Sequence, residues 1–345
     1  MMLQSLTVLD LTSGLGAIAG RMLAELGATV TKVEAGAGDP QRADAPAFAA
    51  WNHGKRSSTA DLATLVPQAD MVIRNPGLDH AALLALNPRL IDVVLAPFLP
   101  GPNRNRPETD LTLMARSGLM AIVGDPDRAP LTMPGEQAHA LGGIQAVIAA
   151  LTALRHRRAT GKGQLVEVSA YQAAVLANYR EPLTWEWTGR VGARTGNLLV
   201  RGASGVRQVW RCKDGFVTWA LVDNPPMMRG MVTVMGDAAG PLAEVDWNAI
   251  LVADTPRPVL EAWEARVEAF FLERTRAELG ELSARHGLGL SWIDAPADVL
   301  ASPHLAARGL WREVDGMKLP GRLWVSSLDA PAPSGHVPGL GEEDA

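Results

Sequence analysis

Two strand-like segments enclose one helix at the start of the chain, and this pattern restricts the possible folds more than any other feature. Residues 6–11 are apolar and rich in β-forming residues, residues 17–27 have helical spacing that stops at Gly27, and residues 28–34 form a second strand-like segment. Strands that are joined by a crossover helix pair in parallel. The start of the chain therefore predicts a βαβ unit.

Further segments of the same kind extend the predicted sheet. Strands are expected at residues 69–75 and 90–98, each after a turn or a helix, so the first part of the chain predicts an open α/β sheet. Residues 144–158 place apolar side chains on one face of a helix, and residues 165–170 alternate as a strand.

The second half of the chain has a different pattern. Residues 209–221 predict a β-hairpin that turns at Lys213, Asp214 and Gly215, and helical segments are expected within residues 258–285. This part therefore predicts a smaller α+β domain. The tail from Leu319 is rich in Pro and Gly, and we expect it to wrap another surface.

Composition and charge argue against several partners. The net charge is −5 and no run of Lys and Arg predicts nucleic-acid binding, because the basic cluster at 155–158 matches the end of the predicted helix. The apolar run 142–154 is too short to span a bilayer, and the first residues lack the pattern of a signal peptide. Cys212 is the only cysteine, which favours a reducing cytoplasm, and the histidines are scattered without the spacing of metal ligands.

Glycines mark the first strand-to-helix turn. Gly14, Gly16 and Gly20, followed by Glu34, approach the dinucleotide-binding fingerprint, but the third glycine is one residue late. A helix N-terminus suits any phosphate or carboxylate. Three interpretations therefore stay open: a tight structural turn, a nicotinamide dinucleotide site, or a site for another phosphorylated ligand near Thr12.

Six segments in the same order resemble class III CoA-transferases of the CaiB/BaiF type, the family of formyl-CoA transferase, carnitine CoA-transferase and α-methylacyl-CoA racemase. The segments are VLDLTSGLGAIAGRMLAELGATVTKVEAGAGDP at 8–40, WNHGKRSSTADL at 51–62, ADMVIRNPG at 69–77, and residues 87–124, 149–169 and 295–315.

The resemblance implies a fold, an assembly and a ligand. It implies a Rossmann-like large α/β domain with a parallel sheet at 1–185, a small α+β domain at 186–295, and a segment 296–345 that returns to the large domain. It also implies an interlocked homodimer that binds coenzyme A as acyl-CoA. The matching CoA-binding positions are Thr12, Ser13, Gly14, Asn75 and Pro76, with Lys55 and Arg56 as phosphate partners.

The catalytic position departs from the family pattern. The resemblance implies an Asp near the start of the helix at Gly142, which attacks the thioester as a nucleophile. The spacing puts His139 there, or Ala138 if the gap is set differently. Glu136 is the only carboxylate between Asp127 and Glu167. Glu136 is therefore the candidate nucleophile and His139 a polar group of the site, against the alternatives of a solvated loop acid and a hydrogen-bonded structural imidazole.

Three functions follow from the resemblance. The first is a CoA-transferase that moves CoA between an acyl-CoA and a small carboxylic acid. The second is an acyl-CoA racemase or isomerase with His139 as base, although the racemase histidine aligns with Thr109, next to Asp110. The third is a catalytically silent CoA-binding subunit that supports an active homologue in a heteromer, which the missing Asp favours.

Overall fold

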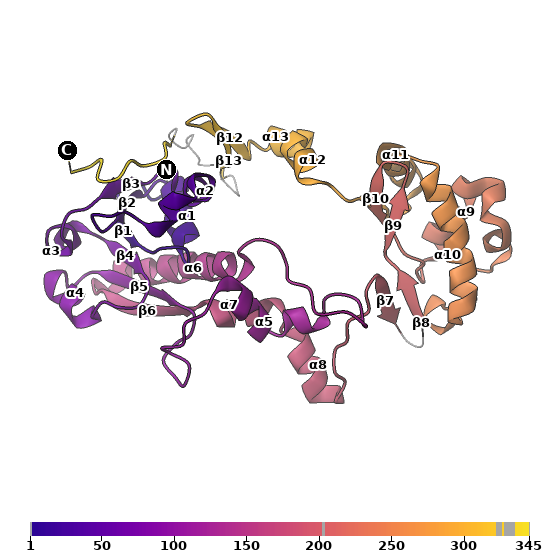
Figure 1. Ribbon diagram of the computed structural model, residues 1–345, viewed down its shortest axis with the longest axis horizontal. Helices are drawn as coiled ribbons and strands as arrows, with labels where there is room; N and C mark the ends of the chain where they lie inside the picture. Colours follow the sequence, from indigo (N-terminus) through magenta and orange to yellow (C-terminus); the bar gives the residue numbers. More distant parts are fainter. Residues whose placement is uncertain (1, 202–203, 322–325, 328–334, 345) are drawn as a thin grey trace. The chain divides into compact units, whose positions relative to one another are not determined.

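The computed structural model describes residues 2–201, 204–321, 326–327 and 335–344 (Figure 1). The chain forms two compact units. The first contains residues 1–121, 131–192 and 302–345, and the second contains residues 122–130 and 193–301. The sequence predicted transitions at 185/186 and 295/296, and it did not predict that residues 122–130 pack with the second unit.

A parallel six-stranded sheet forms the centre of the first unit, as predicted. Its strand order is β3-β2-β1-β4-β5-β6, and each neighbouring pair is parallel. This is the order of a doubly wound dinucleotide-binding fold. The strands are β1 (Thr7–Leu11), β2 (Thr29–Val33), β3 (Arg56–Ser58), β4 (Met71–Arg74), β5 (Ile91–Ala96) and β6 (Gln164–Ser169).

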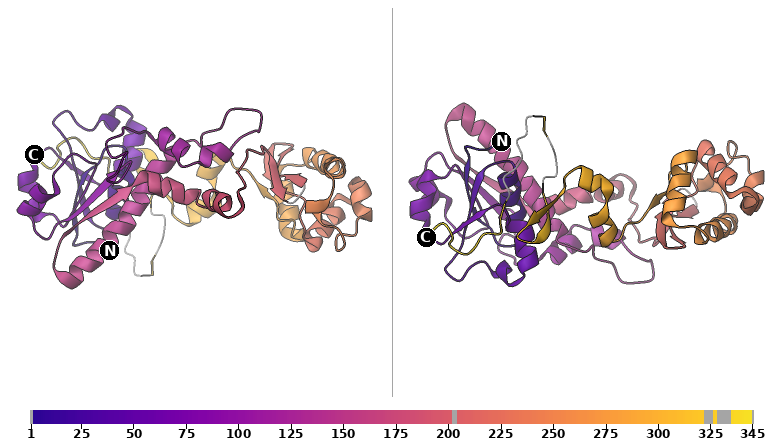
Figure 2. Two further views of the ribbon diagram at one scale, coloured as in Figure 1. Left: turned by 90° about the horizontal axis from the view of Figure 1, so that it is seen from below. Right: turned by 90° about the horizontal axis from the view of Figure 1, so that it is seen from above.

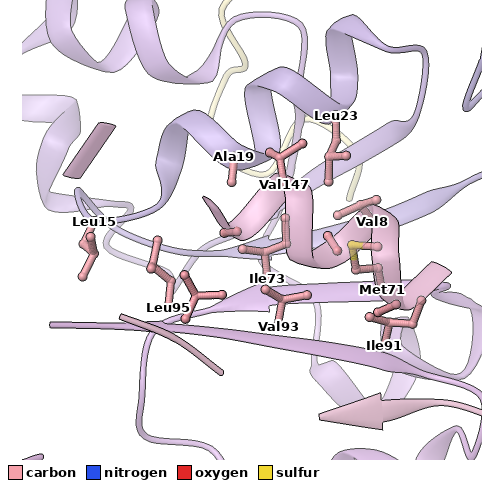
Figure 3. Packing of buried hydrophobic residues seen from close by; sticks show 14 of the residues in the cluster. Val8, Leu15, Ala19, Leu23, Met71, Ile73, Ile91, Val93, Leu95 and Val147 are labelled. Carbon is pink, nitrogen blue, oxygen red and sulfur yellow. The ribbon is translucent and has the colours of Figure 1, made fainter. Parts of the chain in front are cut away.

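Helices cover both faces of this sheet. On one face, α1 (Ala17–Glu25) and α6 (Gln137–Thr160) pack side by side on the strands, as Figures 1 and 2 show. Figure 3 shows Val147 of α6 beside Ala19 and Leu23 of α1, over Val8, Ile73 and Val93 of the sheet. The opposite face carries a smaller apolar cluster with Leu83 of α4 (His80–Leu86).

Short helices complete the first unit around these layers. They are α2 (Ala45–Asn52), α3 (Leu62–Leu65), α5 (Asp110–Arg116), α7 (Ala170–Ala177), α8 (Arg180–Thr188) and α13 (Pro303–Ala307).

Helix α6 is longer than the predicted helical segment 144–158, because it begins at Gln137. It contains 24 residues and its most apolar window has a mean hydropathy of 1.3, so length and composition alone would allow it to cross a membrane. The same criterion is met by the core helix of a soluble protein. Gly142, Gly143 and Ala146 keep one face of α6 narrow, and this face packs against α1, β5 and α7.

The second unit combines short antiparallel strands with helices, as the sequence indicated. The predicted hairpin is present, with β9 (Val209–Cys212) paired to β10 (Gly215–Thr218). Trp210 and Phe271 meet edge to face in its core at 5.7 Å between ring centroids. The remaining elements are β7 (Leu198–Arg201), β8 (Ser204–Arg207), β11 (Ser291–Trp292), α9 (Pro225–Met235), α10 (Arg257–Leu272), α11 (Arg276–His286) and α12 (Pro296–Ala301).

The described part of the chain from residue 302 onward belongs to the first unit, whereas residues 296–301 of the predicted C-terminal segment belong to the second. Strands β12 (Trp311–Val314) and β13 (Met317–Pro320) form a hairpin that packs on α2. The backbone N–H of Glu343 donates to the Ser57 carbonyl at 3.0 Å, and Asp344 accepts from Thr59. Residues 335–344 therefore lie along the outer strand β3; other residues of the predicted tail lie outside the described part of the chain.

Candidate active site

The ends of β1 and β4 are joined by a side chain at the point where the strand order reverses. The Ser13 backbone N–H donates to Asn75 Oδ1 at 3.0 Å, and Asn75 Nδ2 donates to the carbonyls of Leu15 and Leu95 at 2.9 and 3.0 Å. In open α/β sheets, ligands bind beside this switch point at the carboxyl ends of the strands. The structure thus brings the predicted CoA-binding positions Ser13 and Asn75 together.

The turn after β1 leaves its backbone open at this edge. Gly14 and Gly16 have φ values of 68° and 101°, in the left-handed region that favours glycine. A Cβ at Gly14 would meet only the Gln41 amide, at 3.8 Å, so a ligand can approach the backbone there. Thr12 is different: it is 2% exposed and its hydroxyl donates to Asp10 at 2.6 Å. Pro76 follows Asn75 on the exposed surface.

Buried ion pairs contact this turn on the side that faces the protein interior. Lys32 Nζ donates to the Thr12 carbonyl at 2.9 Å and pairs with Asp39, which in turn accepts from the Ser13 hydroxyl at 2.8 Å. Lys55 Nζ pairs with Asp10 at 2.6 Å, and both side chains are fully buried. Charges removed from water in this way require partners, so these ion pairs anchor the turn.

Lys55 does not occupy the phosphate-binding position that we expected. Its ammonium also donates to the Ala17 carbonyl and to Asn52 Oδ1, which uses all three of its N–H donors. Burial lowers the pKa of Lys55 to about 8, although Asp10 opposes that shift. This ion pair explains why position 20 is a glycine, because a Cβ there would lie 2.2 Å from Asp10 Oδ2. The third glycine of the motif makes room for an ion pair.

Arg56 also lies away from the turn. It lines a cavity of about 220 Å³ with Ala24 and Glu25, at the opposite end of α1 from Gly16, and pairs with Glu343 at 2.8 Å. Both cationic positions that the resemblance suggested for phosphate therefore have other partners.

Glu34 does not provide the free ribose-binding acid of a dinucleotide site. It is 6% exposed, and it accepts from Arg42 and Ser57 and from the Asp39 backbone. Burial would raise its pKa, but these hydrogen bonds and the Arg42 charge lower it to about 2. A carboxylate that is already saturated in this way favours a structural role over binding of a ribose hydroxyl.

Three titratable side chains meet at the N-terminus of α6. Glu136 is the N-cap residue of the helix and its side chain is 44% exposed. His139 Nδ1 lies 3.8 Å from Glu136 Oε1 and is buried without a hydrogen-bond partner among the described residues. The His139 backbone N–H donates to Asp110 Oδ1 at 2.9 Å. The structure therefore brings both predicted catalytic residues together and adds Asp110.

This group lies at the same edge of the sheet as the glycine turn. Helix α6 precedes β6, so the helix begins at the edge where the parallel strands end. One turn beyond His139, Gly143 packs directly against Ile18 and Ala19 at the start of α1. The glycine turn and the start of α6 therefore lie at the same edge of the sheet.

Two further positions bear on the chemistry. Thr109, at the position where the resemblance places a racemase histidine, is the N-cap of α5 and forms a capping box with Thr112. Within the described residues, no group of three or more His, Cys, Asp or Glu side chains is arranged to hold a metal ion.

The sequence did not reveal Lys32 or Asp39 as parts of this region, and it named Asp110 only as the neighbour of Thr109, without its contact to residue 139. Asp110 and His139 are 29 positions apart, and their contact depends on how α5 meets α6. A signal for Lys32 was present, since a lysine inside the strand-like segment 28–34 needs a buried partner if both faces of that strand are covered.

Comparison with known proteins is consistent with this geometry. Residues 3–344 match the model of CoA-transferase family III. The chain is 31% identical to the succinate–glutarate CoA-transferase of Agrobacterium fabrum over 92% of its own length and 87% of that protein. It is 28% identical to the succinyl-CoA:(R)-benzylsuccinate CoA-transferase subunit BbsE of Thauera aromatica, over 88% of its length and 82% of that protein.

A solved structure has the same fold. The crystal structure of a CaiB/BaiF family protein from Brucella suis superimposes with a TM-score of 0.87 at 29% sequence identity, and covers 99% of this chain and 96% of that one.

Proposed function

The chain belongs to CoA-transferase family III, and from this premise we propose how it moves coenzyme A between an acyl-CoA and a carboxylic acid. The CoA moiety binds along the carboxyl ends of β1 and β4. The exposed backbone at Ser13 and Gly14 and the Asn75–Pro76 turn provide its contacts. The N-terminus of α6 receives the thioester.

The Ser13–Asn75 hydrogen bond carries this proposal. It fixes the two loops that flank the switch point, where ligands of such sheets bind. Among the described residues, only the uncharged Gln41 amide would lie within 4 Å of a Cβ at Gly14. The N-terminus of α1 adds a favourable field for a phosphate. The buried pairs around Asp10 and Asp39 act as positioning groups for this turn.

Glu136 is the proposed nucleophile. Its carboxylate oxygen attacks the thioester carbonyl carbon, the C–S bond breaks, and CoA leaves as the thiolate, which gives a mixed anhydride on Glu136. The thiolate then attacks the Glu136 carbonyl, releases the first acid and forms an enzyme–CoA thioester, which the acceptor acid resolves through a second anhydride. The exposed carboxylate at the N-cap of α6 supports this role.

A dicarboxylic acid is the proposed acceptor class, because the relatives from Agrobacterium fabrum and Thauera aromatica are named for succinate, glutarate and benzylsuccinate. The test uses succinyl-CoA with glutarate. We expect glutaryl-CoA to form, and we expect mass spectrometry of the protein without acceptor to show an adduct on the peptide that contains Glu136. Glu136→Gln should lose both signals by about 100-fold or more, because an amide is a poor nucleophile.

Glu281→Gln is the matched control, since Glu281 is an exposed residue of α11. It should leave transfer unchanged. Transfer that persists in Glu136→Gln, or an adduct on another carboxylate, would contradict the role of Glu136.

A second candidate is a CoA-binding subunit without chemistry of its own. The observation that favours it is His139 at the position where the resemblance places the nucleophilic Asp, together with a relative that is named as a subunit. This candidate predicts CoA binding, no adduct, and activity only when the chain pairs with an active homologue. The active CoA-transferase, the first candidate, would instead form the homodimer that the resemblance implies.

A further inference from the structure

We infer that His139 and Glu136 give this chain a second activity, the hydrolysis of the bound acyl-CoA by water. The inference goes beyond CoA transfer and gives the same two side chains other roles. It rests on the proposed function only in that the acyl-CoA must bind at this edge of the sheet.

Nδ1 of His139 lies beside a carboxylate. Nδ1 is buried, has no hydrogen-bond partner among the described residues, and lies 3.8 Å from Glu136 Oε1. The side chain as a whole is 17% exposed. The proposal requires the Glu136 carboxylate to close this gap and accept from Nδ1–H, which fixes the proton on that nitrogen. Nε2 is then the nitrogen that accepts a proton.

The backbone of His139 is also held in place. Its N–H donates to Asp110 Oδ1 at 2.9 Å, so the first turn of α6 is tied to the first turn of α5. Asp110 therefore acts as a positioning residue for the imidazole. A base that is oriented by a carboxylate is the arrangement that activates a hydroxyl or a water for attack on an acyl carbon.

The reaction balances with water as the only co-reactant. His139 Nε2 takes a proton from water while the water oxygen attacks the thioester carbonyl carbon. The tetrahedral intermediate collapses with cleavage of the C–S bond, and the imidazolium returns the proton to the CoA thiolate. The products are the free acid and CoA thiol. The N-terminus of the 24-residue α6 stabilises the oxyanion through its positive end.

The residue type at position 139 decides which reaction that position itself can perform. A carboxylate there attacks the thioester itself and keeps the acyl group on the protein. An imidazole with an orienting carboxylate instead favours proton transfer from water. The exchange of Asp for His thus changes the chemistry of the position.

The experiment measures CoA thiol released from succinyl-CoA without an acceptor, in parallel with the transfer assay. His139→Gln should lower hydrolysis by about 100-fold, because the general base is lost, and should lower transfer by a clearly smaller factor, because Glu136 remains as the nucleophile. Glu136→Gln should abolish transfer but lower hydrolysis by only about 10-fold, because His139 remains. His286→Gln, at the end of α11, is the matched control and should change neither rate.

A rescue experiment separates chemistry from structure. His139→Ala with added imidazole should recover part of the hydrolysis, whereas a merely structural histidine would not respond. Equal losses of both activities in His139→Gln, or an absence of rescue, would overturn the inference.

The outcomes also separate this inference from the proposed function. An adduct and transfer without hydrolysis would overturn the inference and leave the transferase intact. Hydrolysis without any adduct would support the inference and contradict Glu136 as nucleophile.

Discussion

Position 139 is the residue at which this chain departs most clearly from its family pattern. The spacing of the α6 segment places His139 where the resemblance implies an aspartate, and the structure keeps it beside Glu136 and Asp110. Asp110 Oδ1 accepts a hydrogen bond from the backbone N–H of residue 139. The start of α6 presents the positive end of the helix dipole to this position.

His139→Asp should add a second nucleophile, at the position where the resemblance places it. We expect an acyl adduct on residue 139 and transfer at least about 10-fold faster than in the wild type, because a nucleophilic carboxylate returns to a helix N-terminus that favours its charge. The measurement is transfer from succinyl-CoA to glutarate together with mass spectrometry of the trapped protein. Unchanged transfer with no adduct at 139 would show that the surrounding site no longer supports this chemistry.

Single residues also show what the sequence could and could not reveal. Ser13, Gly14 and Asn75 were predicted at the CoA site, and they lie together at the switch point. The structure shows that these residues lie together, and their role in CoA binding stays a prediction. Lys55 could not be recognised as buried, because its partner Asp10 is 45 positions away and lysine is ordinarily a surface residue.

At the scale of elements, apolar strands and the long helix were predictable and the outer strand was not. Strands β4 and β5 are continuous apolar runs apart from Arg74 and Asp92, which pair with each other. Strand β3 has only three residues, Arg56–Ser58, and no apolar side chain. Its pairing depends on β2 and on residues 335–344, so no local pattern could indicate it.

His53, between α2 and β3, connects this edge to the C-terminal hairpin. Its Nε2 lies 3.1 Å from the Pro320 carbonyl of β13, and the residue is 5% exposed. Burial, with the nearby Arg21 charge, lowers the pKa of His53 to about 4 from its ordinary value of 6.5. Between these values the unfolded chain binds a proton that the folded chain does not, so acidification from pH 6.5 towards 4 favours unfolding.

We predict that His53→Gln removes this pH sensitivity. Relative to the variant, the wild type should lose about 1–3 kcal/mol of unfolding free energy between pH 7 and pH 4, and the two should have parallel stabilities above pH 7. Urea unfolding at both pH values measures the difference. Parallel stability curves down to pH 4 would show that folding does not lower the pKa of His53.

At the scale of the whole molecule, the β3-β2-β1-β4-β5-β6 order accounts for where chemistry can occur in the first unit. The strand order reverses between β1 and β4, so their loops diverge and leave space for a ligand. Helix α6 begins at the same edge and packs against the start of α1. The general fold followed from βαβ patterns and from the resemblance. The composition of the two units did not, because residues 122–130 join the second unit through contacts such as Gly196 N–H to the Gly124 carbonyl.

Amide hydrogen exchange of the full chain, with and without CoA, tests the central claim that this edge binds the cofactor. Bound CoA should slow exchange in residues 12–16 and 75–77, and an acyl-CoA should extend the protection to residues 136–139, while α10 in the second unit serves as the internal reference. Protection confined to other segments, such as residues 53–56, or no protection at saturating CoA, would contradict the account.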